Sequence, residues 1–255
     1  MVKPDKQAGD DRRCITRRGL LRAGFALGGL GVCALAGNVV SAYAVEEGDS
    51  VRYAVGKEIR YTGSAFTNIM YCDDAIAYCA WPRKYTPAEG TYAVEVARCR
   101  NTSGSPDSEV GWTYEIADTM LRATMWFGYG GPGFDPDVFP PEPWDGGSWT
   151  DDKYYVVTHL NESCYYLWDG GVQAQWGVSQ SFKQWAERWI YGPSSGHAPD
   201  CMEQKMSTRA GEIPGWFKVY AINQDQASTQ PVIFAAGEPT GEASLAKSAL
   251  QQPWL

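Results

Sequence analysis

Two regions of the chain, one in its first half and one in its last fifth, show the alternation of apolar and polar residues that is typical of β-strands. Near the start, β-branched and aromatic residues alternate with others at residues 51–55 and again at 91–96. The pattern returns after Pro214, at residues 216–222 and 232–235. Because successive side chains of a strand point to opposite faces, these segments are predicted to be strands that flank the middle of the chain.

Between these strands, apolar residues recur at intervals of three and four, which predicts helices. Three helices are expected, at about residues 108–127, 150–169 and 179–191. Each begins at a serine or threonine whose hydroxyl can cap free backbone N–H groups, and each ends at a glycine. The middle of the chain is therefore predicted to be helical.

The order of elements favours an α+β fold. Because the helices are grouped, an antiparallel β-sandwich or barrel-like core with an inserted helical lobe at about residues 108–191 is expected rather than a doubly wound sheet. The domain is predicted to span residues 45–237. Residues 238–255 are small and polar, which indicates a C-terminal tail or linker.

Residues 1–44 are typical of a twin-arginine export signal. Arg17 and Arg18 precede an uncharged, small and apolar stretch at residues 23–40, and an A-x-A cleavage site ends at Ala44. A membrane anchor is the alternative, but the glycines and weak hydrophobicity argue against it. We expect a secreted or cell-surface protein, cleaved near Ala44, whose mature chain has no membrane span.

Composition and charge exclude several classes of protein. The 255 residues are 44% hydrophobic and 13% aromatic, which excludes a disordered chain. The formal net charge is −8. Residues 45–255 hold 15 basic and 27 acidic residues, so the charge after cleavage is −12. Such an acidic surface excludes a general nucleic-acid binder.

Neither a cofactor nor a metal is predicted. Residues 128–133 match G-x-G-x-x-G, but they follow a helix and do not open one, so a turn is expected. His159 and His197 are far apart in the sequence, and no C-x-x-C pair accompanies them. The residue types of a zinc site are therefore present without its spacing.

Five cysteines remain after cleavage, and an exported protein uses cysteines mostly in disulfides. They are Cys72, Cys79, Cys99, Cys164 and Cys201. Because five is odd, at least one has another role.

Several blocks around one of these cysteines resemble the bacterial thioester domains of surface adhesins. The first block is Tyr78-Cys79-Ala80-Trp81, followed by a Pro-x-x-Gly-x-Tyr turn at residues 87–92. Further blocks follow in the family's order, at residues 126–133, 155–160, 217–220 and 229–233. Together they extend the resemblance over residues 65–236.

The resemblance implies roles for three residues. It places the family's reactive cysteine at Cys79 and its thioester-forming glutamine at Gln230. The family's Thr-Gln-x-Ala block falls on residues 158–161, where His159 replaces the glutamine, so a proton-transfer role for His159 is a hypothesis. Cys72 also follows a tyrosine, but only Cys79 is followed by the expected turn. The other four cysteines are left for at most two disulfides.

The resemblance also implies a function. The thiol would displace ammonia from the glutamine side chain, and the stored thioester would capture an amine or hydroxyl of a surface protein or glycan without turnover. Tyr78, Trp81 and the pair Trp126-Phe127 are expected to keep water away from the bond. The bond would also join the two ends of the domain.

Two other functions remain open at this point. Cys79 and His159 could act as nucleophile and base in an acyl-transfer enzyme, resembling a protease or a transglutaminase. Alternatively, some of the 11 tryptophans could line a non-covalent carbohydrate-binding groove, although Trp185 and Trp189 lie on a helical stripe and are expected in the core. The oligomeric state stays open.

Overall fold

Seven strands form one antiparallel sheet in a computed structural model of the chain. The model describes residues 45–81, 84–99, 114–167, 177–190 and 198–236, and these all belong to one compact unit. The strands are β1 (Ser50–Thr62), β2 (Ala65–Cys72), β3 (Ala75–Cys79), β4 (Gly90–Ala93), β5 (Glu95–Val96), β6 (Val219–Ile222) and β7 (Val232–Ala235).

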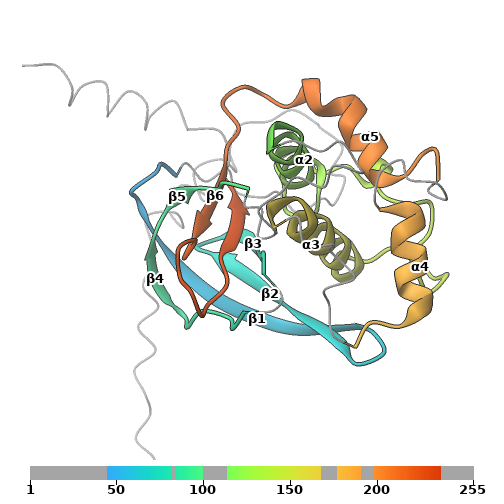
Figure 1. The fold of residues 1–255 in the computed structure, drawn as a ribbon, viewed down its shortest axis with the longest axis horizontal. Coiled ribbons are helices and arrows are strands. Elements are labelled where there is room, and N and C mark those ends of the chain that lie inside the picture. Colours follow the sequence, from blue (N-terminus) through green and yellow to red (C-terminus); the bar gives the residue numbers. More distant parts are fainter. Residues whose placement is uncertain (1–44, 82–83, 100–113, 168–176, 191–197, 237–255) are drawn as a thin grey trace, which may run out of the picture. The chain divides into compact units, whose positions relative to one another are not determined.

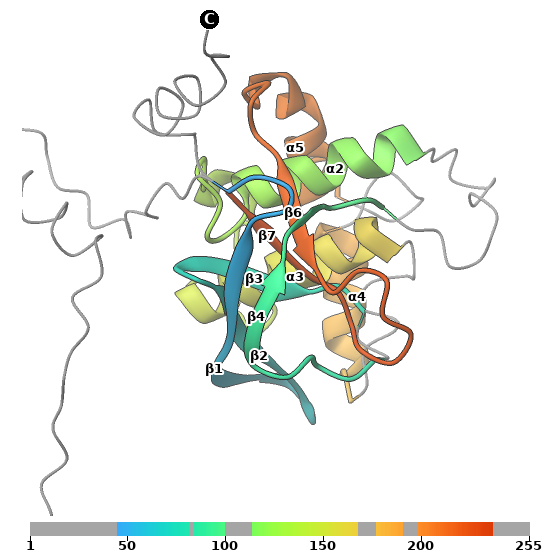
Figure 2. The same ribbon diagram turned by 90° about the vertical axis from the view of Figure 1, so that its left-hand side faces the viewer.

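The strand order explains why the sheet is nearly closed. Its order is β4-β1-β2-β3-β7-β6-β5, so β4 and β5 form the two edges. These edge strands follow each other in the chain with only Val94 between them. The sheet therefore curves round until its edges adjoin (Figure 1, Figure 2). This arrangement confirms the predicted α+β fold with a barrel-like antiparallel core.

Four helices of the described residues accompany the sheet. They are α2 (Tyr114–Phe127), α3 (Asp151–Leu167), α4 (Gln180–Trp189) and α5 (Met202–Arg209), with short 3-10 turns at Pro136–Val138 and Ala210–Glu212. Helices α2 and α3 pack on each other and both contact the sheet, α2 at β6 and β7 and α3 at β1 and β3 (Figure 1). Helix α3 is therefore the helix that can bring side chains to the end of β3.

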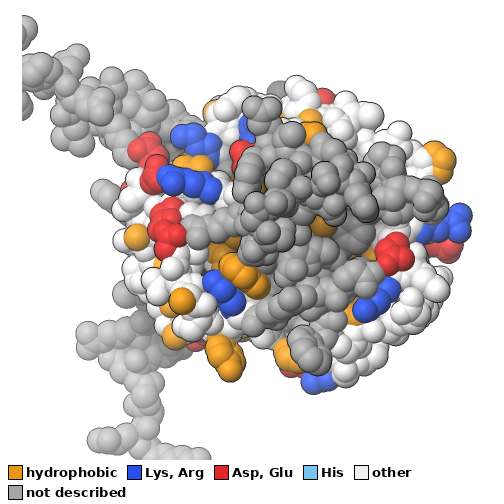
Figure 3. Space-filling view, in the orientation of Figure 1, with side chains coloured by type: hydrophobic (Ala, Val, Ile, Leu, Met, Phe, Trp, Pro, Cys, Tyr) orange, Lys and Arg blue, Asp and Glu red, His pale blue; other side chains and the backbone are white. Residues whose placement is uncertain are grey.

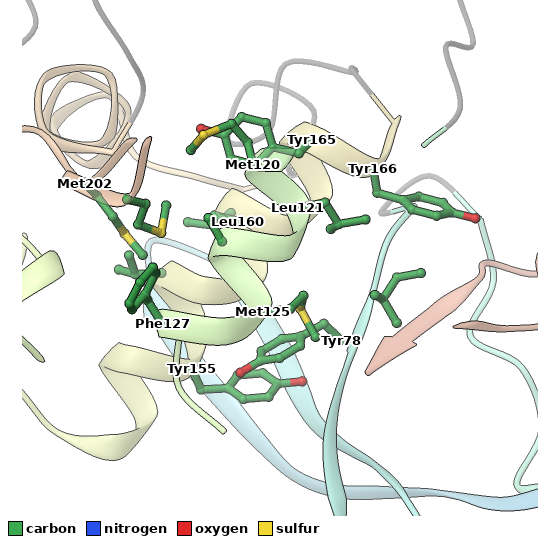
Figure 4. Packing of buried hydrophobic residues seen from close by; sticks show 14 of the residues in the cluster. Tyr78, Met120, Leu121, Met125, Phe127, Tyr155, Leu160, Tyr165, Tyr166 and Met202 are labelled. Carbon is green, nitrogen blue, oxygen red and sulfur yellow. The ribbon is translucent and has the colours of Figure 1, made fainter. Parts of the chain in front are cut away.

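Alternate residues of the strands divide between two hydrophobic clusters. The helix-side cluster contains Tyr78 and Ile233 together with the apolar faces of α2 and α3. The sheet-interior cluster contains Cys72, Cys79 and Val232. Figure 4 shows part of the helix-side cluster, in which Tyr78 from β3 lies beside Tyr155 from α3. Their rings stack with centroids 4.7 Å apart.

The helix predictions agree with the structure where the chain is described. Helix α4 begins where expected, because the Ser179 hydroxyl accepts a hydrogen bond from the N–H of Phe182. The predicted cap at Ser108 lies outside the described residues. Helix α5 was not expected, since its stripe of Met202 and Met206 is too short to give a clear period.

Two further expectations concern loops. Residues 128–133 form a turn after α2, as predicted, with Gly130 at a φ of 82° where its missing side chain avoids Ile76. The predicted strand from residue 216 begins only at Val219. Phe217 instead closes a turn onto Pro214, and Trp216 is 37% exposed.

The described surface has charges of both signs. On the face in Figure 3, acidic and basic side chains are interspersed near the edge formed by β4 and β5. Arg98 and Glu47, for example, lie 3.9 Å apart there. None of the described helices is both long and apolar enough to cross a bilayer.

Candidate functional site

The structure brings Cys79 and Gln230 together. Cys79 is the last residue of β3, which pairs with β7 so that Cys79 lies opposite Val232. The pairing continues past the strand ends, where the N–H of Ala80 donates to the carbonyl of Pro231 at 3.0 Å. Gln230 thus lies next to the end of β3, and its side-chain amide acts to lower the pKa of the nearby Cys79 thiol.

Gln230 is buried, and both its backbone and its side chain are held by hydrogen bonds. Its backbone N–H donates to the carbonyl of Tyr85 at 2.9 Å, and its backbone carbonyl accepts from the Asn223 side chain at 2.9 Å. The amide nitrogen Nε2 donates to the hydroxyl of Thr86 at 3.1 Å. The amide oxygen Oε1 is buried and has no hydrogen-bond partner among the described residues. A buried carbonyl oxygen without a partner is unusual in a folded protein.

His159 reaches the same point from α3. Its ring nitrogen Nε2 lies 2.8 Å from the backbone carbonyl of Cys79 and 3.1 Å from the Cys79 sulfur. The other nitrogen, Nδ1, lies 3.1 Å from the hydroxyl of Thr67 on β2. Since a carbonyl oxygen only accepts, Nε2 holds the ring proton, and Nδ1 accepts from Thr67.

Burial sets the protonation of both groups. His159 is 3% exposed, and burial lowers its pKa to about 4, so its ring is neutral at pH 7. Burial, followed by the carboxyl group of Glu162, raises the pKa of the Cys79 thiol to about 12. The free thiol is therefore protonated at neutral pH, and a thiolate here would be costly.

Two further side chains support Cys79 from α3. The hydroxyl of Ser163 donates to the carbonyl of Cys79 at 3.2 Å, beside the His159 contact. Glu162 is fully buried, and its Oε2 lies 3.3 Å from the same hydroxyl. Burial raises the pKa of Glu162 well above its usual range, which favours the neutral acid.

A small pocket opens beside these groups. Its volume is about 170 Å³, and its lining includes Cys79, His159, Gln230, Thr67 and Lys84. Phe66 also lines it and is 52% exposed. A small nucleophile can thus approach the cysteine and glutamine through this pocket.

A family comparison identifies the class of domain to which this site belongs. The model of the family described as "Thioester domain" matches residues 43–199, which is more than half of the chain. The chain belongs to the thioester domain family. The matched segment includes Cys79 and His159 and ends before Gln230.

Solved structures similar to this thioester domain include three domains of bacterial surface proteins. The N-terminal domain of the Streptococcus pyogenes pilus tip adhesin Cpa is 12% identical, with 77% of this chain and 97% of that chain covered and a TM-score of 0.41. The N-terminal thioester domain of fibronectin-binding protein SfbI from Streptococcus pyogenes is 10% identical, with coverage of 76% and 95% and a TM-score of 0.40. The N-terminal thioester domain of a Clostridium perfringens surface protein is 12% identical, with coverage of 73% and 98% and a TM-score of 0.35. No curated protein sequence matches.

The aromatic residues expected to shield the site divide into two groups. Tyr78 is buried beneath it, stacked on Tyr155. Trp81 lies nearby, where its ring packs under the Lys84 ammonium at 3.8 Å. Trp126 and Phe127 do not line the pocket. Trp126 instead packs on Phe217, with ring centroids 4.9 Å apart, because α2 turns that face toward the segment before β6.

The expected disulfides are absent from the described residues. All five cysteines of this thioester domain lie in the described part of the chain, and each is a free thiol. Cys72 belongs to the sheet-interior cluster, whereas Cys99 packs against the helix-side cluster. Cys164 lies on α3, and Cys201 precedes α5. The cysteines are thus spread over different layers of the fold. The number of cysteines in the sequence does not indicate which of them lie close together.

Several site residues had no signal in the sequence. Thr67, Thr86 and Ser163 are single polar residues in a strand, a loop and a helix, and no motif marks them. Glu162 follows the Thr158–Asn161 block but is not part of it. In the described part of the chain, no group of three His, Cys, Asp or Glu side chains could hold a metal ion.

Proposed function

We propose that this thioester domain is a surface-adhesion module that captures its ligand covalently, in a single turnover, through a bond between Cys79 and Gln230. The observation that supports this best is that the pairing of β3 with β7 brings Cys79 and Gln230 to the lining of one small pocket. The ligand is a surface protein or glycan that offers an amine or a hydroxyl group.

The thioester bond can form from the two side chains alone, since all atoms are accounted for without any added reagent. The Cys79 sulfur attacks the amide carbon of Gln230, the S–C bond forms, and the C–N bond breaks. The thiol proton leaves with the amide nitrogen as ammonia. Thr86 holds that nitrogen at 3.1 Å, so the leaving group already has a hydrogen-bond partner. The product is an acyl thioester, which lasts as long as water is kept from its carbonyl carbon.

Capture of the ligand is the second step. The ligand's nitrogen or oxygen forms a bond to the Gln230 carbon, and the Cys79 sulfur leaves. His159 is the proposed proton-transfer residue, because its Nε2, which holds the ring proton, lies 3.1 Å from that sulfur. A donor is needed there, since a bare thiolate is disfavoured in this buried site.

Intact mass spectrometry tests this function directly. The wild-type protein, denatured under reducing conditions, is expected to be lighter than its sequence by one ammonia. Incubation with methylamine should add one methylamine and expose one more alkylatable thiol, while Cys79→Ala and Gln230→Ala should show neither change. A wild-type protein with its full sequence mass that forms no adduct would contradict the proposal.

The cysteine-protease alternative receives less support from this geometry. A Cys–His nucleophile needs a low thiol pKa and an imidazole nitrogen free to accept the thiol proton. Here burial raises the thiol pKa, and Nε2 donates to the Cys79 carbonyl. The carbohydrate alternative is also weaker, because Trp144, Trp149 and Trp185 pack on one another rather than forming an open row.

The proposed location is the cell surface or the medium, after twin-arginine export. The signal at residues 1–44 lies outside the described residues. N-terminal sequencing of the exported protein should begin at Val45, and substitution of Arg17 and Arg18 by lysine should retain the protein in the cytoplasm. Export that is unaffected by these substitutions would contradict a twin-arginine route.

A further inference from the structure

We propose that Thr67 is a proton-transfer residue of the capture step, which relays the ligand's proton through His159 to the leaving Cys79 sulfur. This inference rests on the proposed thioester function and extends it to a residue that no family motif marks. Thr67 lines the pocket on β2 and is 6% exposed. Its hydroxyl thus lies between the space for the nucleophile and the buried imidazole.

The hydrogen bonds set the direction of the relay. The carbonyl of Cys79 fixes the ring proton on Nε2, so Nδ1 must accept and the Thr67 hydroxyl must donate to it. The oxygen of Thr67 keeps its lone pairs for another donor, such as an entering hydroxyl. On the other side of the same ring, Nε2, which holds the proton, lies 3.1 Å from the Cys79 sulfur.

Each proton moves over one hydrogen bond. As the ligand oxygen bonds to the Gln230 carbon, its proton passes to Thr67, and the Thr67 proton passes to Nδ1. The C–S bond breaks, its electron pair stays on sulfur, and the Nε2 proton moves to that sulfur. Threonine and thiol end neutral, and the ring ends as the other neutral tautomer.

The surroundings favour such a neutral relay over separated charges. Burial lowers the pKa of His159 to about 4 and raises that of Cys79 to about 12, so both an imidazolium and a thiolate are costly here. Proton transfer along the relay avoids forming either ion. Because the domain reacts once, the ring does not need to return to its first tautomer.

The relay also points to the class of ligand. A neutral amine can attack a thioester before it loses a proton, whereas a hydroxyl is a weak nucleophile unless a base takes its proton during the attack. Thr67 and His159 therefore help a hydroxyl far more than an amine. The expected ligand class is a sugar or a side chain that presents a hydroxyl group.

Two nucleophiles and three variants test the relay. The rates of adduct formation with glycerol and with methylamine are measured by intact mass for wild type, Thr67→Val and Thr67→Ser. Thr91→Val is the matched control, because Thr91 is an exposed threonine on β4. Loss of ammonia in each variant shows that the thioester has formed before the rates are compared.

Thr67→Val is expected to slow the glycerol reaction about 100-fold and the methylamine reaction less than about 10-fold. Thr67→Ser should restore most of the glycerol rate, and Thr91→Val should match wild type. Equal slowing of both reactions, or no slowing, would overturn the relay. Absence of ammonia loss in the wild type would instead contradict the thioester itself.

A measurement on the wild type covers the case in which Thr67→Val does not form the bond. The glycerol rate is measured in mixtures of H₂O and D₂O. Several protons in motion give a curved dependence of the rate on the deuterium fraction, and this is expected. A linear dependence would mean that one proton moves, and it would overturn the relay.

Discussion

Cys72 and Cys79 lie at the ends of adjacent strands, and each follows a tyrosine. Cys72 ends β2 and is fully buried, and Cys79 ends β3 and is 7% exposed. Both belong to the sheet-interior cluster. Burial raises the thiol pKa in both cases, and a carboxyl group raises it further, Asp73 for Cys72 and Glu162 for Cys79. By local sequence and burial the two cysteines are close equivalents.

Their neighbours differ. Cys72 adjoins the hairpin turn at Asp73, and no side-chain hydrogen bond to its sulfur occurs in the described part of the chain. Cys79 lies at the pocket, with His159 Nε2 3.1 Å from its sulfur and Gln230 in the same pocket lining. Cys72 is also buried and likewise has a raised thiol pKa. The chemistry proposed for Cys79 therefore depends on its neighbours, His159 from α3 and Gln230 from the segment before β7.

The largest expected difference is between Cys79→Ala, which should lose the thioester completely, and Cys72→Ala, which should keep it. Cys79→Ala should abolish the ammonia loss and the methylamine adduct, because it removes one half of the bond. Cys72→Ala should keep both, since Cys72 is not among the residues that line the pocket. Intact mass of the two variants side by side measures this, and the reverse result would transfer the proposed bond to Cys72.

The next effect concerns stability. A bond between Cys79 and Gln230 closes a loop of about 150 residues. By analogy with a disulfide, opening it with methylamine should lower the free energy of unfolding by up to about 5 kcal/mol. Urea unfolding before and after treatment measures the drop. The Cys72→Ala variant should show the same drop on treatment. Gln230→Ala should show no change on treatment, and a drop there would point to a cause other than the bond.

His159→Gln should remove the neighbour that distinguishes Cys79, without removing the bond. The ammonia loss should persist, while the glycerol reaction slows about 100-fold. Burial lowers the pKa of His159 to about 4, so the wild-type rate should stay level from pH 7 to about 5 and fall as the pH drops through 4, where Nδ1 becomes protonated. The variant should lose this fall. A wild-type midpoint near 6.5, the ordinary histidine value, would contradict a buried neutral ring.

The smallest effect is expected at Cys72. Its side chain fills space in the sheet-interior cluster, so Cys72→Ala should cost about 1 kcal/mol of unfolding free energy. Urea midpoints measure it, with the thioester opened in both proteins so that only packing differs. A cost several times larger would indicate that Cys72 does more than fill space.

The sequence predicted the elements better than the site. Ser179 caps α4 as its pattern indicates, because a cap depends on residues only two or three positions away. Trp216 was expected in a strand, but the turn between Pro214 and Phe217 holds it outside the sheet. Helix α5 was missed because eight residues are too few to show a helical period.

The sequence by itself determined the order of strands and helices, because each element depends on contacts between residues that are near neighbours in the chain. Motif resemblance singled out both Cys79 and Gln230, but it says nothing of their distance, and the pairing of β3 with β7 is what places Gln230 beside Cys79. Likewise, α3 packing on the sheet decides which nitrogen of His159 faces Cys79 and which faces Thr67. These contacts join residues far apart in sequence, so no local pattern encodes them; they exist only once the sheet has curved and the helix has packed against it.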